Sequence, residues 1–106
     1  MRFQGRVVIV TGAARGIGAV TAEAFAREGG RLAVLDLDGP GADATAKRLR
    51  EIGAEAVGFR ADAAAPAEVR AVVEAVVGRW SRIDVLVNNA GGFATMRATE
   101  DITDEE

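Results

Sequence analysis

Apolar residues form four short runs along the chain, separated by longer stretches in which apolar and polar residues alternate at helical spacing. The four runs are residues 6–10, 31–36, 56–60 and 83–87. The stretches between them are residues 16–28, 40–52 and 66–80. Such short apolar runs are typical of parallel strands covered on both faces, and the longer stretches are typical of amphipathic helices. The alternation predicts an α/β fold built from right-handed βαβ units.

The apolar positions also predict which side of each helix meets the sheet. In the first helix these positions are Ile17, Val20, Ala24 and Phe25. In the second helix they are Ala42, Ala46, Leu49 and Ile52. Residues 93–102 have no clear period and are expected to form a loop, so the fourth strand would have an unpaired edge. Thr103 and Glu106 then have the spacing of a helix N-terminus, which predicts a sheet truncated after its fourth strand.

A doubly wound parallel sheet of this kind has the strand order 3-2-1-4, and its ligand binds where the order reverses, between strands 1 and 4. The carboxyl ends of all four predicted strands point toward that crevice. The residues at or just beyond these ends are Gly12, Asp36, Asp62 and Asn89. Their convergence predicts a binding site for a dinucleotide.

Three glycines in the turn after the first strand each have a physical reason to be there. Gly12 permits a tight turn, Gly16 lets the backbone approach a pyrophosphate, and Gly18 lets the helix pack closely on the strand. The free N–H groups of the helix N-terminus would face the phosphates. A glycine-rich turn alone is equally consistent with an ordinary strand-to-helix connection. The strand before it and the helix after it favour the nucleotide site.

Asp36 ends the second predicted strand. In this position a carboxylate can accept hydrogen bonds from the hydroxyl groups of an adenosine ribose. The alternative is that Asp36 is a surface residue of the turn that leads into Gly39 and Pro40. The preceding glycine turn favours the ribose role.

Composition excludes several classes of function. The chain has 106 residues, enough for one domain, and a net charge of −3, too small to indicate a nucleic acid or a membrane surface as partner. It has no cysteine and no histidine, so we expect neither thiolate chemistry nor a metal site. No apolar run approaches the about 20 residues of a membrane span, and no signal peptide is recognisable. We therefore expect a soluble, cytoplasmic protein.

The chain resembles the N-terminal half of a short-chain dehydrogenase/reductase. The resemblance rests on Thr11 and the glycines that follow it, on Asp36 and Asp62, and on the run Asn88-Asn89-Ala90-Gly91. It covers all 106 residues. It implies a Rossmann-like sheet, with residues 1–106 as an incomplete NAD(P)-binding half-domain. A nucleotide-sugar epimerase relative has the same fold but fits the glycine spacing and the Asn-Asn-Ala-Gly run less well.

The resemblance also implies a role for each residue of the cofactor site. Gly12, Arg15, Gly16, Ile17 and Gly18 would line the pyrophosphate. Asp36 and Leu37 would hold the adenosine ribose, and Asp62 and Ala63 would flank the adenine. Asn89, Ala90 and Gly91 would lie near the ribose and the pyrophosphate bridge. The family usually has a bulkier apolar residue in place of Ala63, so the adenine contact would be looser here.

Two residues give opposite indications about the cofactor. Arg15 precedes the second glycine, where a basic residue in related sequences often favours the 2′-phosphate of NADP. Asp36 would repel that phosphate and lose its hydroxyl partners. Because the carboxylate is the closer group and Arg15 can swing into solvent, the sequence favours NAD(H) over NADP(H).

The catalytic residues that the resemblance implies, a Tyr-x-x-x-Lys pair assisted by a serine, are missing from the chain. There is no tyrosine, Lys47 lies on the second helix, and Ser81 lies at the amino end of the sheet. No catalytic residue is therefore assigned.

Two hypotheses remain open. The chain is either the NAD(H)-binding portion of a homo-oligomeric oxidoreductase that acts on alcohols or carbonyls, or a complete, non-catalytic module that binds a dinucleotide or a partner. The apparent end at a helix start and the unpaired edge of the fourth strand favour the first.

Overall fold

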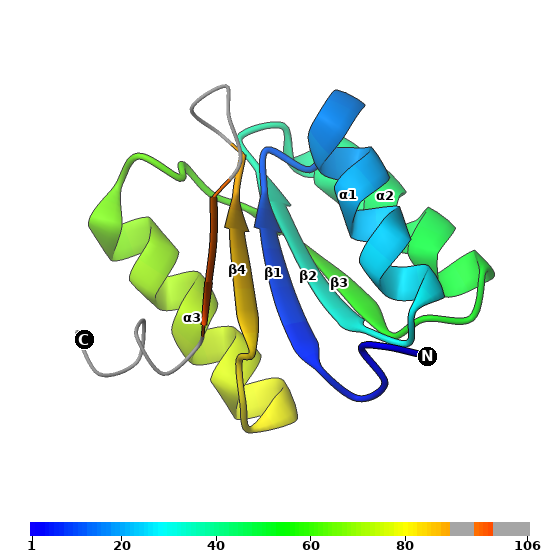
Figure 1. Cartoon of the computed structure of the whole chain (residues 1–106). Coiled ribbons are helices and arrows are strands. Elements are labelled where there is room, and N and C mark those ends of the chain that lie inside the picture. The colour runs from blue at the N-terminus through cyan, green and yellow to red at the C-terminus, as the bar shows by residue number, and fades with distance from the viewer. Residues whose placement is uncertain (90–94, 99–106) are drawn as a thin grey trace.

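The computed structural model describes residues 1–89 and 95–98. Within these ranges the chain forms three helices and one five-stranded sheet of order β3-β2-β1-β4-β5 (Figure 1). The strands are β1 (Val7–Thr11), β2 (Arg31–Asp36), β3 (Ala56–Arg60), β4 (Val85–Asn88) and β5 (Thr95–Ala98). The helices are α1 (Gly16–Arg27), α2 (Gly39–Glu51) and α3 (Pro66–Trp80). The predicted α/β class and the parallel order of the first four strands are confirmed.

Helices cover both faces of the sheet: α1 and α2 lie on one face and α3 on the other (Figure 1). Side chains of β1 alternate between the two faces. Val8 and Val10 pack on the side of α1 and α2, whereas Val7 and Ile9 pack on the side of α3. Each of these four residues is at most 2% exposed. This two-sided burial explains why residues 7–10 of the strand are all apolar instead of alternating between apolar and polar.

The buried side of α1 differs from the predicted side. Ile17 and Val20 are each 69% exposed, and of the four predicted core residues only Phe25 is buried. The buried residues of α1 are Gly18, Ala19, Ala22, Phe25 and Ala26. The cause is the close approach of α1 to the turn after β1, where a Cβ on Gly18 would collide with the carbonyl oxygen of Gly12. Apart from Phe25, the helix therefore turns small residues toward the sheet, while Ile17 and Val20 face the solvent.

The core side of α2 also differs at two positions. Ile52 is 43% exposed because it lies beyond the last turn of the helix, whereas Thr45 is fully buried. The predicted contributions of Ala42, Ala46 and Leu49 to the core are confirmed. The buried Thr45 contacts the turn that follows β1.

The outer edge of β4 is paired, contrary to the prediction of a free edge followed by a loop. Residues 95–98 form β5, antiparallel to β4, with Val85 opposite Ala98 and Asn88 opposite Thr95. The four residues of β5 are too few and too mixed in polarity for a strand period to be recognised. The helix start expected at Thr103 and the rest of the predicted loop lie outside the described residues.

Candidate functional site

The turn between β1 and α1 lies at the carboxyl edge of the parallel strands. Gly12 and Gly16 both have φ of +62°, in the left-handed region that favours glycine. A Cβ on Gly16 would have no atom within 4 Å. Gly16 thus borders open space, as the approach of a ligand to the backbone requires. The predicted close packing at Gly18 is present, against the carbonyl of Gly12.

The N-termini of α1 and α2 differ in whether a side chain caps them. At α2, the Asp38 carboxylate accepts a hydrogen bond of 3.0 Å from the Gly41 amide and so caps the helix. At α1, no side chain of the described residues caps the helix, and its first turn carries no acidic residue. The first N–H groups of α1 therefore lack the carboxylate that α2 has, which leaves the positive end of the α1 dipole suited to an anion.

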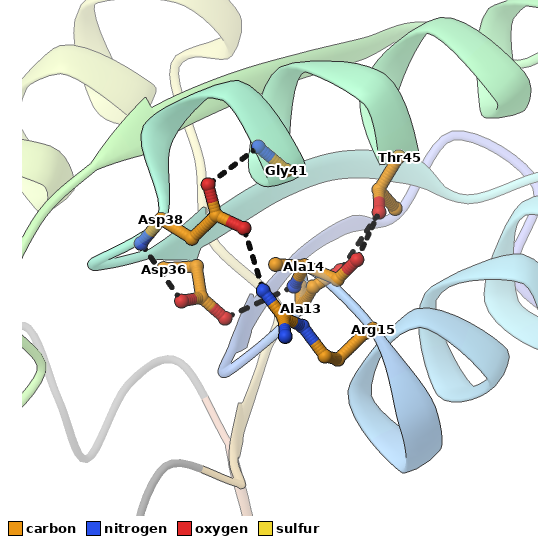
Figure 2. Close-up of polar contacts among 7 residues, drawn as sticks. All are labelled: Ala13, Ala14, Arg15, Asp36, Asp38, Gly41 and Thr45. Atoms are coloured by element: carbon orange, nitrogen blue, oxygen red, sulfur yellow. Dashed lines mark hydrogen bonds and ion pairs between the residues drawn. The ribbon is translucent and has the colours of Figure 1, made fainter.

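Asp36 lies at the end of β2, opposite the glycine turn (Figure 2). One of its carboxylate oxygens accepts a hydrogen bond of 3.0 Å from the Ala14 amide, and the other accepts one of 3.0 Å from the Asp38 amide. These two bonds fix the orientation of the carboxylate. Because each oxygen has further lone-pair capacity, the group can still accept hydrogen bonds from two neighbouring hydroxyl groups.

A hollow of about 250 Å³ adjoins Asp36. Five of the predicted site residues line it, namely Gly12, Asp36, Leu37, Asp62 and Ala63. The remaining lining residues are Leu35, Ala61 and Ala64. The structure thus brings together residues from the ends of β1, β2 and β3 that are far apart in the sequence.

A larger hollow of about 350 Å³ lies at the opposite edge of the sheet, lined by residues such as Gln4, Gly30, Gly53 and Glu55. It adjoins the C-terminal ends of α1 and α2. Helix C-termini present carbonyl oxygens and the negative end of the helix dipole, which disfavour a phosphate. The hollow beside Asp36 is therefore the better candidate for an anionic ligand, although it is the smaller of the two.

Thr11, at the end of β1, connects this edge to β4. Its hydroxyl oxygen lies 3.0 Å from Oδ1 of Asn88 and accepts a hydrogen bond of 2.8 Å from the Asn89 amide. The Thr11 side chain thus lies between the two asparagines. Ala90 and Gly91, the other predicted residues of this segment, lie outside the described residues.

Thr45 was not identified from the sequence. Its hydroxyl donates a hydrogen bond of 2.9 Å to the Ala13 carbonyl and so holds the glycine turn from α2 (Figure 2). The sequence does contain a pattern that places Thr45 on the core side of α2: it comes three residues after Ala42 and four before Leu49. A buried hydroxyl needs a partner, which indicates a polar contact at that position.

Two more of the predicted site residues, Arg15 and Ile17, lie at this edge. Arg15 and Ile17 are exposed at the start of α1, and the Arg15 guanidinium forms an ion pair of 2.8 Å with Asp38. Lys47 is exposed on α2, and Ser81 follows α3 at the amino edge of the sheet. Neither Lys47 nor Ser81 lines the hollow beside Asp36.

In residues 1–89 and 95–98, no three His, Cys, Asp or Glu side chains gather as metal ligands would. No helix of the described part combines the length and the hydrophobicity that crossing a bilayer requires.

Comparison with known proteins gives consistent matches. The family model described as short chain dehydrogenase matches residues 6–106. D-threitol dehydrogenase of Mycolicibacterium smegmatis is 47% identical over 90 residues, which cover 85% of this chain and 35% of that protein.

Two solved structures share the fold. A hydroxysteroid dehydrogenase from Escherichia coli matches with a TM-score of 0.82 and 33% identity, over 86% of this chain and 39% of that one. A short chain dehydrogenase/reductase from Burkholderia phymatum, solved in complex with NAD, matches with a TM-score of 0.77 and 34% identity, over 81% and 31%. The chain thus spans well under half the length of these proteins.

Proposed function

The chain belongs to the short-chain dehydrogenase family, and we propose that it is the NAD(H)-binding portion of an oxidoreductase that acts on an alcohol or a carbonyl. The nicotinamide would accept or donate the hydride, while this chain binds and orients the cofactor. One observation carries the proposal: the uncapped N-terminus of α1 and the fixed carboxylate of Asp36 lie at the same edge of the sheet. A dinucleotide offers a pyrophosphate to the first and ribose hydroxyls to the second.

The pyrophosphate would lie over the glycine turn. The open space at Gly16 permits close approach to the backbone, and the first N–H groups of α1 would donate hydrogen bonds to phosphate oxygens. Gly12, Gly18 and the exposed residues Arg15 and Ile17 complete this group. The Arg15 guanidinium would be available to bind the pyrophosphate only when it is not paired with Asp38.

The adenosine would occupy the hollow beside Asp36. Asp36 would accept hydrogen bonds from the ribose hydroxyls, since its two existing bonds leave lone pairs available. Leu37 is 57% exposed at the border of the hollow and offers an apolar surface. Asp62 and Ala63 would flank the adenine from the end of β3.

The segment after β4 would bind the middle of the cofactor. Asn89, Ala90 and Gly91 are assigned to the ribose and the pyrophosphate bridge. Support comes from the Thr11 hydroxyl, which holds the Asn89 amide at 2.8 Å and so fixes where this segment leaves the sheet.

We assign NAD(H) as the preferred cofactor. The Asp36 carboxylate is held at the end of β2 by two backbone amides, so it cannot easily turn away from the ribose. A carboxylate in that position would repel the 2′-phosphate of NADP(H) and accept hydrogen bonds from the free 2′-hydroxyl of NAD(H).

Titration of the chain with NADH and with NADPH, followed by the fluorescence of the reduced nicotinamide, tests this assignment. We expect saturable binding of NADH and weaker binding of NADPH. Equal or tighter binding of NADPH would contradict the NAD(H) preference alone. Binding of neither dinucleotide would contradict the proposed function.

Hydride transfer is tested on the whole protein by following NADH absorbance with a panel of alcohols and ketones. Turnover of one of them supports the oxidoreductase, whereas NADH binding without turnover of any favours the non-catalytic module. The homo-oligomeric state and the cytoplasmic location expected from the sequence stay predictions.

A further inference from the structure

Arg15 is engaged by a carboxylate instead of standing free in solvent. Its guanidinium Nη2 lies 2.8 Å from Oδ2 of Asp38 (Figure 2). The sequence argument for NADP(H) depended on this guanidinium, because a basic residue here can bind a 2′-phosphate. In the structure its charge is already opposed by a neighbouring carboxylate.

Asp38 is itself held in place by the backbone. Its other carboxylate oxygen accepts the hydrogen bond from Gly41 that caps α2, and its own amide donates to Asp36. The bond from Gly41, followed by that from Arg15, lowers the pKa of Asp38 below its ordinary value, so both contacts favour the charged form of this carboxyl. The Asp38 charge is thus fixed beside both Arg15 and the predicted ribose position.

We propose that Asp38 is a specificity-determining residue that selects NAD(H) against NADP(H) by pairing with Arg15. This inference rests on the proposed function. A 2′-phosphate beside Asp36 would meet two carboxylates, and it would have to displace Asp38 to reach the Arg15 guanidinium. A free 2′-hydroxyl meets neither obstacle, because it is uncharged and can donate to Asp36.

A purely structural role for Asp38 is the competing explanation, since a helix N-cap by itself accounts for an aspartate at this position. An exposed ion pair contributes little to stability, so a variant that loses the pair with Arg15 but keeps the cap should still fold. The substitution Asp38→Asn separates the two roles. Asparagine caps a helix about as well as aspartate, but it carries no charge to hold Arg15 or to repel a phosphate.

The experiment measures the ratio of the dissociation constants for NADPH and NADH in four chains: the wild type, Asp38→Asn, Arg15→Gln and the double variant. We expect Asp38→Asn to lower this ratio about three- to tenfold, because one repulsive charge is lost and Arg15 is released. The effect should be clearly smaller in the Arg15→Gln background, and it should shrink at high salt. Circular dichroism of Asp38→Asn checks that α2 is intact.

Each outcome bears on a different claim. An unchanged ratio in a folded Asp38→Asn chain that binds NADH would overturn the specificity role and leave the proposed function standing. A full effect in the Arg15→Gln background would show that Arg15 has no part and overturn the pairing mechanism. Failure of the wild type to bind either dinucleotide would overturn the proposed function and this inference together.

Discussion

The hydroxyl of Thr11, at the end of β1, lies 3.0 Å from Oδ1 of Asn88, at the end of β4. The same oxygen accepts the amide of Asn89 at 2.8 Å. β1 and β4 flank the point where the strand order reverses, which is where doubly wound sheets bind their ligands. The side chain of Thr11, a residue that is 3% exposed, therefore joins the ends of the two strands that border this crevice.

Replacing Thr11 by valine is expected to lower the free energy of unfolding by about 1–3 kcal/mol. Valine has nearly the same shape but leaves the Asn89 amide without its acceptor. Urea unfolding followed by fluorescence measures the effect. Thr11→Ser, which keeps the hydroxyl, is the matched control and should recover most of the loss. If valine and serine behave alike, the hydrogen bonds of Thr11 do not stabilise the junction.

Replacing Asp36 by alanine is expected to weaken NADH binding by about 1–3 kcal/mol, because charge-assisted hydrogen bonds are lost. The loss of the acceptor for Ala14 also loosens the glycine turn, which acts in the same direction. The measurement is a fluorescence titration with NADH. Glu51→Ala, which removes a negative charge from the exposed end of α2, is the control. Unchanged affinity in Asp36→Ala would remove this residue from the site.

The two central strands, β1 and β2, could be predicted because they are buried on both faces of the sheet. The run that became β2 (Arg31–Asp36) has the predicted bounds, since a short apolar run between a glycine pair and a polar turn has few other conformations. The position of Asp36 at a carboxyl end follows from the same pattern. β5 could not be predicted in this way, because its pairing with β4 depends on a partner strand and not on its own sequence.

The helix faces were harder to predict. Apolar size indicated Ile17 and Val20 as core residues of α1, but the contact at Gly18 decides which side of the helix faces inward. The hydrogen bonds of Thr45 and Asp38 were not predictable from periodicity either. Thr45 bonds to the Ala13 carbonyl in the turn after β1, and Asp38 accepts from the Gly41 amide in the first turn of α2. Periodicity places an element in the fold, but it does not give the distance between two elements or the hydrogen bonds between their side chains.

Two glycines in helices should respond in opposite ways to alanine. Gly18→Ala should destabilise the fold by about 1–3 kcal/mol, because the new methyl group would collide with the Gly12 carbonyl. Gly78→Ala, in α3, should stabilise it by about 0.5–1 kcal/mol, since a Cβ there meets nothing within 4 Å. Urea unfolding of the two variants gives the comparison. Equal effects on the free energy of unfolding would mean that α1 does not need its close contact with the turn.

At the amino edge of the sheet, Asp84 connects β4 to β1. Its side chain is 11% exposed and accepts hydrogen bonds from the Val7 amide at 2.8 Å and from Arg82 at 2.6 Å. Burial raises the pKa of Asp84, but the hydrogen bonds from Arg82 and Val7 and the positive charges of Arg82 and Arg6 together outweigh burial, so the pKa lies below its ordinary value. The folded chain therefore favours the charged form of this carboxyl more than the unfolded chain does.

Acid should therefore destabilise the fold through Asp84. A carboxyl whose pKa is lower in the folded state contributes stability that is present above its unfolded pKa of about 3.9 and is lost as pH falls through its folded pKa. We expect the free energy of unfolding of the wild type to fall as pH decreases from about 5 to below 4, and that of Asp84→Asn to fall less steeply. At pH 7 the variant should be less stable by about 1–2 kcal/mol.

Urea unfolding between neutral and acidic pH, followed by the fluorescence of Trp80, tests this expectation, because Trp80 is the only tryptophan and is 8% exposed. Glu51→Gln is the matched control, since it neutralises an exposed carboxylate at the end of α2. Its pH dependence should follow that of the wild type. If the curve of Asp84→Asn also runs parallel to that of the wild type, acid acts through other carboxylates, and the junction of β1 and β4 does not depend on the charge of Asp84.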